Sequence, residues 1–204
     1  MIKDLLARAG VYSLAARAIG ATEGRRRYVS RYIRPQAGDR ILDIGCGPCD
    51  IVEALPAVDY HGFDLSADYV AAAREKFGAR GQFHVESVNL DLVKKYAGFD
   101  LVLALGVLHH LTDAEAVDLF RVAHAALKPG GRLVTLDGCF KAGQSSIARQ
   151  LLKNDRGQYV RDEPAYLGLA RRVFSAVKPT IASDLLRIPY THLIMECQRE
   201  TGAA

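Results

Sequence analysis

The stretch Ile41–Asp50 constrains this sequence more than any other, because it joins an apolar run, an acid and closely spaced glycines. It reads Ile-Leu-Asp-Ile-Gly-Cys-Gly-Pro-Cys-Asp. The apolar run predicts a buried parallel strand, and Gly45 and Gly47 predict a tight turn into a helix near 51–55. The N-terminus of a helix placed in this way points free N–H groups at a ligand. Glycine loops bind several kinds of cofactor, so the rest of the chain must decide between them.

The composition is that of a globular protein with one domain. The chain has 204 residues, of which half are hydrophobic and a quarter charged, enough for a single domain with a substantial core. No apolar run reaches the length of a membrane span, and Arg8 and Arg17 interrupt the N-terminal segment. We therefore expect no signal peptide, no membrane contact and a cytoplasmic location. The four cysteines are then expected to be reduced thiols.

The positive charge is small but unevenly distributed. The net charge is +4, and arginines cluster within 25–34 and at 171–172. Arginine binds carboxylates and phosphates through its planar, forked guanidinium group, although a solvated helix face is the simpler interpretation of most of these side chains. The sequence has no lysine-rich tail and no added RNA-binding module, so its composition argues against nucleic acid as a partner.

The order of the predicted elements indicates an α/β fold. The N-terminal part is expected to form two helices, over 2–19 and 25–33, which either cap the active edge of the sheet or cover one of its faces. Strands are predicted at 40–44, 60–64, 82–85, 99–105 and 132–137, with helices at 67–77 and 113–127 and a short helix before 96. Later residues predict helices near 146–152 and 163–174 and a hairpin-like pair of strands at 180–186 and 191–197. This alternation predicts a doubly wound, mostly parallel sheet with helices on both faces.

Five motifs in order resemble those of class I S-adenosylmethionine-dependent methyltransferases. They are Ile41–Gly47, Gly62–Ser66, Phe99–Leu103, Gly106–Leu111 and Leu127–Leu133. The resemblance covers about half of the chain, and the motifs are specific as a set although each is loose alone. It implies a Rossmann-like sheet of seven strands, the last of which is antiparallel and lies beside the sixth. The whole chain would be one methyltransferase domain, divided into an N-terminal helical cap (1–37), a cofactor-binding core (38–137), a substrate or lid insertion (138–178) and closing strands (179–204).

The resemblance also implies a site for S-adenosylmethionine, which leaves as S-adenosylhomocysteine. The loop residues Gly45, Cys46 and Gly47 would approach the methionine portion of this cofactor. Asp43 would orient the loop or reach the amino group, and Asp64 would accept hydrogen bonds from the ribose hydroxyls.

Around the adenine the resemblance is less complete. Leu65 would lie against the adenine face. Ser87 stands where the family usually has an acid, and Cys49 stands where many members have a glycine. The other cofactor residues that the resemblance implies are Val88, Leu105 and Gly106.

The acceptor side of the site rests on fewer residues. His110 is the first candidate for a base, needed only if the acceptor must lose a proton, because histidine titrates near neutrality. A structural role is the alternative for His110. The histidines do not have the spacing of metal ligands, so no metal is expected. Candidate acceptor-binding residues are Tyr12, Arg25, Asp137, Arg156 and Tyr159.

The sequence therefore predicts in-line methyl transfer to a small-molecule acceptor and leaves open whether oxygen, nitrogen or carbon is methylated. An RNA methyltransferase and a non-catalytic protein that binds S-adenosylmethionine are the alternatives. A nicotinamide-dependent oxidoreductase would need Gly-x-Gly-x-x-Gly, but the third glycine position is Asp50. Cys46 and Cys49 also match the dithiol motif of thioredoxin-like proteins. Because the chain has no tryptophan and its length is about twice that of a thioredoxin, we interpret this match as a coincidence.

Overall fold

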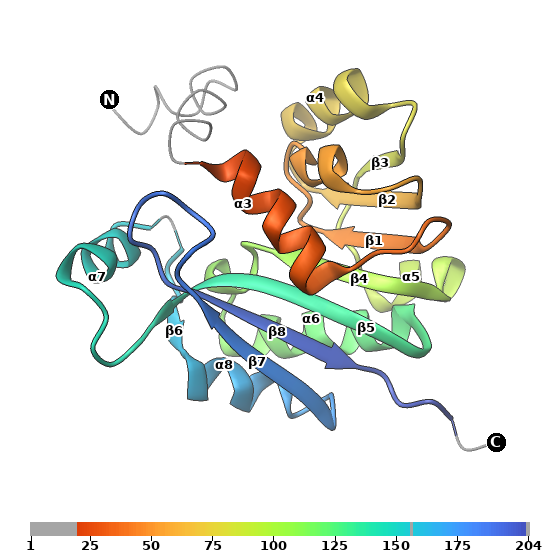
Figure 1. Cartoon of the computed structure of the whole chain (residues 1–204). Helices are drawn as coiled ribbons and strands as arrows, with labels where there is room; N and C mark the ends of the chain where they lie inside the picture. Colours follow the sequence, from red (N-terminus) through yellow and green to blue (C-terminus); the bar gives the residue numbers. More distant parts are fainter. Residues whose placement is uncertain (1–19, 156, 203–204) are drawn as a thin grey trace.

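A computed structural model describes residues 20–155 and 157–202 of the chain (Figure 1). In this part of the chain one central sheet lies between two layers of helices. The predicted helix over 2–19 lies outside the described residues. No helix among the described residues is long and apolar enough to span a membrane.

The sheet has the predicted mostly parallel architecture. Its main path follows the order β3-β2-β1-β4-β5-β8-β7, and β8 is antiparallel to both of its neighbours. A strand of two residues, β6 (Arg161–Asp162), pairs with β5 off this path. The α/β fold class is thus confirmed, including the antiparallel last strand. The strands of the main path are β1 (Arg40–Ile44), β2 (Asp59–Asp64), β3 (Gln82–Val85), β4 (Phe99–Leu105), β5 (Leu127–Phe140), β7 (Ala176–Ala182) and β8 (His192–Gln198).

The helical segments connect these strands and have recognisable start signals. Ser66 caps α4 by accepting a hydrogen bond from the N–H of Tyr69, and Thr112 and Glu115 form a reciprocal capping box at α6. The helices are α3 (Ala21–Tyr28), α4 (Ala67–Phe77), α5 (Leu90–Tyr96), α6 (Asp113–Ala126), α7 (Ser146–Lys153) and α8 (Glu163–Ala170). A π-helix, η1 (Val29–Ile33), and two 3₁₀ helices, η2 (Asp50–Ala54) and η3 (Leu108–His110), complete the set.

Two hydrophobic clusters, one on each face of the sheet, explain why β4 is almost uniformly apolar. Leu101 and Leu103 belong to the cluster beneath α3, η1, η2 and α4, whereas Val102 and Ala104 belong to the cluster beneath α5, α6 and α8. Successive side chains of a strand point to opposite faces. A strand covered on both sides therefore needs apolar residues at every position.

The segment from α3 to η1 covers a face of the sheet. Tyr28 is buried in the cluster on that face, and its hydroxyl donates a hydrogen bond of 3.2 Å to the carbonyl of Thr135 on β5. Arg132 of β5 donates to the carbonyls of Tyr32 (2.8 Å) and Ile33 at the end of η1. Of the two interpretations of the second N-terminal helix, covering a face is therefore the one that fits residues 21–33.

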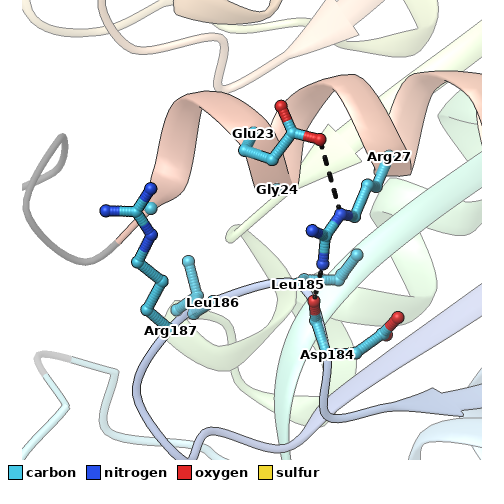
Figure 2. A pocket seen from close by; sticks show the side chains of 8 residues that line it. Glu23, Gly24, Arg27, Asp184, Leu185, Leu186 and Arg187 are labelled. Atoms are coloured by element: carbon cyan, nitrogen blue, oxygen red, sulfur yellow. Dashed lines mark hydrogen bonds and ion pairs between the residues drawn. The ribbon is translucent and has the colours of Figure 1, made fainter.

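This helix starts earlier than predicted because Gly24 does not interrupt it. A Cβ atom at Gly24 would lie 2.0 Å from the carbonyl oxygen of Leu185, so glycine is required here for close approach of the loop before β8. Figure 2 shows the pocket beside Gly24, in which Arg27 bridges Glu23 and the carbonyl of Asp184. This pocket holds about 90 Å³, well below the roughly 300 Å³ at which small-molecule sites begin.

Three further boundaries differ from the prediction. β7 begins at Ala176 rather than at 180, and it contains Pro179, which lacks a donor; β7 lies at the edge of the sheet, where proline is tolerated. β5 runs from Leu127 through the Lys-Pro-Gly-Gly turn, with a register shift opposite β4 between Phe99 and Leu101. α8 ends at Ala170 rather than at 174.

Candidate active site

The glycine loop after β1 folds back over the end of β2. The N–H groups of Gly45 and Cys46 both donate to the carbonyl of Phe63, at 2.8 and 3.0 Å. Gly45 and Gly47 have φ values of 70° and 54°, which only glycine adopts without a steric penalty. A Cβ atom at Gly45 would lie 2.8 Å from Cγ2 of Val107, in the loop after β4. The loop therefore lies where the strand order reverses between β1 and β4, the crevice that binds ligands in such sheets.

Asp64 joins the glycine loop to the end of β2. Its carboxylate accepts a hydrogen bond of 2.8 Å from the N–H of Gly47 and another of 2.8 Å from the N–H of Ser66. An ionised carboxylate has about four acceptor positions. Asp64 can therefore hold the loop and still accept hydrogen bonds from a pair of hydroxyl groups.

Asp43 is the most deeply buried acid of the loop. It is 1% exposed, and the hydroxyl of Tyr60 donates a hydrogen bond of 2.6 Å to its Oδ2 atom. Burial raises the pKa of this carboxyl group to about 7; the hydrogen bond from Tyr60 opposes the shift, and the charge of Asp64 adds to it. Its Oδ1 atom has no hydrogen-bond partner among the described residues. A buried acceptor of this kind suits a cationic amino group, as S-adenosylmethionine would supply.

The ends of β2 and β3 present apolar side chains that the protein itself leaves uncovered. Leu65 is 75% exposed, and Tyr69 and Val85 are also exposed. Ser87 is exposed and Val88 is half-buried in the following loop. Apolar side chains beside polar loop groups are the usual lining of a cofactor site, so these positions fit an adenine ring.

The end of β4 forms the floor of the crevice. Gly106 has a φ of 73°, and its N–H donates a hydrogen bond of 2.7 Å to the carbonyl of Leu136 on β5. This bond positions Leu105 and Gly106 between β1 and β5. The imidazole of His109 follows directly, because its Cε1 atom lies 3.6 Å from the place of a Cβ atom at Gly106.

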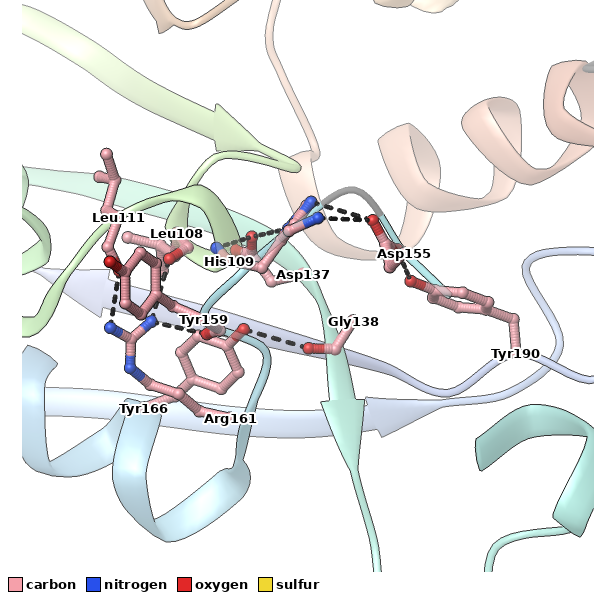
Figure 3. Close-up of polar contacts among 11 residues, drawn as sticks. Leu108, His109, Leu111, Asp137, Gly138, Asp155, Tyr159, Arg161, Tyr166 and Tyr190 are labelled. Atoms are coloured by element: carbon pink, nitrogen blue, oxygen red, sulfur yellow. Dashed lines mark hydrogen bonds and ion pairs between the residues drawn. The ribbon is translucent and has the colours of Figure 1, made fainter. Parts of the chain in front are cut away.

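His109 is held in place by acidic residues. Its Nδ1 atom lies 2.9 Å from Oδ1 of Asp137, and its Nε2 atom lies 3.6 Å from Oδ1 of Asp155 (Figure 3). His110 is exposed, and its ring centroid is 4.2 Å from that of His109. The structure therefore brings predicted Asp137 into contact with His109, the neighbour of predicted His110.

The other predicted acceptor residues are spread over the molecule. Tyr159 is exposed, and its N–H donates a hydrogen bond of 2.9 Å to the carbonyl of His109. Arg25 lies 3.1 Å from Asp50, on the helical turn that follows the glycine loop. Tyr12 and Arg156 lie outside the described residues.

The two cysteines of the loop lie side by side but are poorly suited to thiol chemistry. Both thiols are free and lie 3.6 Å from the carbonyl oxygen of Gly47. Hydrogen bonding with Cys49, burial and the nearby acids raise the pKa of the Cys46 thiol well above its ordinary value. Redox motifs work through thiolates of lowered pKa, so this environment argues against a thioredoxin-like activity. Among the described residues no group of three potential ligands could hold a metal ion.

Sequence reasoning did not name Tyr60, Asp155 or Tyr190 as single site residues, although Asp155 lies in the predicted substrate or lid insertion (138–178). Tyr60 contacts Asp43 across the pair β1–β2, and Tyr190 contacts Asp155 across 35 residues of sequence. The one usable signal was the position of Asp137 at the end of a strand next to β4, which places it beside the turn that carries His109.

The strand order and the glycine loop at its reversal point define a Rossmann-like protein that binds a cofactor. A family model described as a methyltransferase domain matches residues 42–133. A ubiquinone biosynthesis O-methyltransferase from Xanthomonas axonopodis pv. citri (strain 306) is 36% identical over 115 residues, which are 53% of this chain and 46% of that protein. Phosphoethanolamine N-methyltransferase 1 from Triticum aestivum is 31% identical over 156 residues, which are 72% of this chain and 30% of that protein.

A solved structure shows the same fold over almost its full length. The TehB-like S-adenosylmethionine-dependent methyltransferase from Corynebacterium glutamicum ATCC 13032 matches with a TM-score of 0.64 at 20% identity, covering 95% of this chain and 99% of that one. The solved structure shows the fold alone. The family model and the two curated relatives, with the loop geometry and the five motifs, identify residues 42–133 as a class I S-adenosylmethionine-dependent methyltransferase domain. Its cofactor is accordingly S-adenosylmethionine. The chain spans less than half the length of the two curated relatives.

Proposed function

We propose that this protein transfers the methyl group of S-adenosylmethionine to a small-molecule acceptor. The observation that carries the proposal is the link between Asp64 and the N–H of Gly47, because it places an acid with spare acceptor positions beside the glycine loop. The curated relatives named above are called O- and N-methyltransferases, which supports this class of reaction.

The residues of the chain would hold the cofactor and leave the chemistry to it. Asp64 would bind the ribose, the free oxygen of Asp43 would receive the amino group, and Leu65 would lie on the adenine. When bound, the cofactor supplies an activated methyl group, and the protein contributes position and the exclusion of water. No nucleophile of the protein is required.

The test is cofactor binding by Asp64→Asn, measured by calorimetry with S-adenosylhomocysteine. The substitution removes the charge and turns one acceptor oxygen into a donor that faces another N–H group. Charge-assisted hydrogen bonds contribute about 1.5–3 kcal/mol each, so the dissociation constant should rise at least tenfold, to roughly a hundredfold. Asp118→Asn is the matched control, since Asp118 is exposed on α6 and pairs with Arg121. Equal affinity of the Asp64 variant and the wild type would disprove the assignment.

The same protein can be tested against the alternatives. Thermal stabilisation by S-adenosylhomocysteine but not by NAD is expected, and the reverse would favour an oxidoreductase. Radioactive methyl groups should enter the small-molecule fraction of a cell extract; label in RNA would favour an RNA methyltransferase. Tight binding of the cofactor without any labelled product would point to a non-catalytic binding protein.

A further inference from the structure

A chain of polar side chains connects four separate segments on the acceptor side of the site. His109 comes from η3, Asp137 from β5, Asp155 from the loop after α7, and Tyr190 from the loop before β8 (Figure 3). The hydroxyl of Tyr190 donates to Oδ2 of Asp155, and Oδ1 of Asp155 faces Nε2 of His109. The imidazole therefore lies between two carboxylates that are far from it in sequence.

Asp137 determines which nitrogen of His109 carries a proton. Its Oδ1 atom accepts hydrogen bonds from both the backbone N–H (3.2 Å) and the Nδ1 atom (2.9 Å) of His109. A carboxylate only accepts, so Nδ1 is the protonated nitrogen of the neutral ring and Nε2 carries the lone pair. Both side chains are buried: His109 is 8% exposed and Asp137 is 3% exposed. The orientation and the tautomer of the ring are thus imposed by β5.

Packing keeps the ring in this position. A Cβ atom at Gly157 would lie 2.0 Å from Cδ2 of His109, so the loop after Asp155 closes directly on the imidazole. On the other side the ring borders Gly106, which ends the strand at the crevice. His109 is consequently the titratable group that the fold places between the cofactor loop and the segment after β5.

The surroundings favour the charged form of His109. Burial acts against the imidazolium, but the hydrogen bond and charge of Asp137 and the charge of Asp155 outweigh it, and the pKa is raised. Other titratable groups surround this cluster. The ring of His110 lies beside His109, and Tyr190 binds Asp155 and packs on His192. The charge of Asp137 also acts on Tyr28, Cys139 and Tyr166. A base whose protonated form is stabilised in this way accepts a proton readily.

We propose that His109 is the base for methyl transfer to a hydroxyl group, with Asp137 and Asp155 as its positioning residues. This inference rests on the proposed function. The hydroxyl oxygen forms a bond to the methyl carbon as its proton passes to Nε2 of His109. The pair of electrons of the broken carbon–sulfur bond stays on sulfur, so a neutral thioether leaves. The imidazolium then lies between Asp137 and Asp155 until its proton is released to solvent.

The charges of the cluster favour a hydroxyl over an amine. An amine arrives as an ammonium ion without a lone pair, and two neighbouring carboxylates stabilise that ion and raise its pKa. The same carboxylates stabilise the imidazolium that forms when a neutral hydroxyl is deprotonated. The acceptor expected here is therefore an alcohol, phenol or catechol.

The first readout does not depend on turnover. Nuclear magnetic resonance of the histidine rings should show His109 protonated on Nδ1 in its neutral form, with a pKa raised above the ordinary value of histidine. Asp155→Asn should lower the pKa of His109, and the signal of His124, which does not contact Asp155, serves as the reference. An Nε2–H tautomer, or a pKa of His109 that Asp155→Asn does not move, would overturn the role of these carboxylates.

The second readout is methyl transfer to a panel of phenols and catechols and a matched panel of primary amines. Transfer to a hydroxyl is expected, and His109→Asn should lower kcat by about a hundredfold or more and remove the acidic limb of its pH profile. In His109→Asn the asparagine side chain keeps a donor toward Asp137. His109→Gln is the second variant, and His124→Asn is the control. The inference would be refuted by methyl transfer to amines alone or by transfer to no member of either panel. A decrease of kcat in His110→Asn rather than in His109→Asn would refute it as well. Failure of S-adenosylhomocysteine to bind the wild type would refute the proposed function itself.

Discussion

The contact between Gly45 and Val107 gives a prediction that separates backbone strain from crowding. Gly45 and Gly47 both have positive φ values, 70° and 54°, and an alanine in this region costs about 1–2 kcal/mol. A Cβ atom at Gly45 would also lie 2.8 Å from Cγ2 of Val107, whereas one at Gly47 would meet nothing within 4 Å. Valine is stiff about χ1, so the crowding adds roughly 1–3 kcal/mol.

Gly45→Ala should therefore lower the free energy of unfolding by about 2–5 kcal/mol, and Gly47→Ala by about 1–2 kcal/mol. In a Val107→Ala background the crowding term disappears, so the double-mutant cycle of Gly45→Ala with Val107→Ala should give a coupling of roughly 1–3 kcal/mol. Urea unfolding of the protein without cofactor measures all four variants. Equal losses of stability in the two glycine variants, or a cycle that is additive within about 0.5 kcal/mol, would show that Val107 does not crowd Gly45.

Two further predictions concern buried charge. The pKa of Asp43 is about 7 in the folded protein against an ordinary 3.8, so the folded state binds this proton more tightly than the unfolded state does. The proton therefore stabilises the fold fully below about pH 4, and this stabilisation is lost as the pH rises through 7. At 1.36 kcal/mol per pKa unit it amounts to about 4 kcal/mol. Asp43→Asn should flatten that part of the pH profile of urea unfolding; parallel profiles would contradict it. Arg161 binds Asp113 with two nitrogens and donates to the carbonyls of Leu108 and Leu111. Arg161→Lys should therefore lower the free energy of unfolding by roughly 1.5–3 kcal/mol, measured by thermal or urea unfolding. A decrease below about 0.5 kcal/mol would show that these contacts are dispensable.

The sheet and the glycine loop are predictable because their signals are local. An apolar run such as Phe99–Leu105 predicts a strand buried on both faces, and Leu101 and Val102 indeed enter opposite clusters. Gly45 and Gly47 likewise require positive φ wherever the rest of the chain lies. Motif order then indicates the family, and the α/β class, the mostly parallel sheet and the antiparallel last strand follow from it.

Boundaries that depend on distant contacts are not predictable in this way. Gly24 looks like a helix breaker in sequence, yet it lies inside α3, and glycine is needed there because the carbonyl of Leu185 leaves no room for a Cβ atom. Pro179 looks like the end of a strand, but it is tolerated because β7 is at the sheet edge. In both cases the meaning of the residue depends on a neighbour far away in the chain.

The same reason separates what the sequence by itself determined about the site from what the tertiary structure decided. The sequence determined the cofactor loop and the acid at Asp64, since strand, turn and acid are arranged along a short stretch of chain. From the sequence, His110 was the first candidate for the base, because nothing local distinguishes it from His109, one position away on the same turn. Only the pairing of β4 with β5 and the return of the loop at Asp155 place one imidazole between two carboxylates, because side chains separated by tens of residues meet only after the chain has folded.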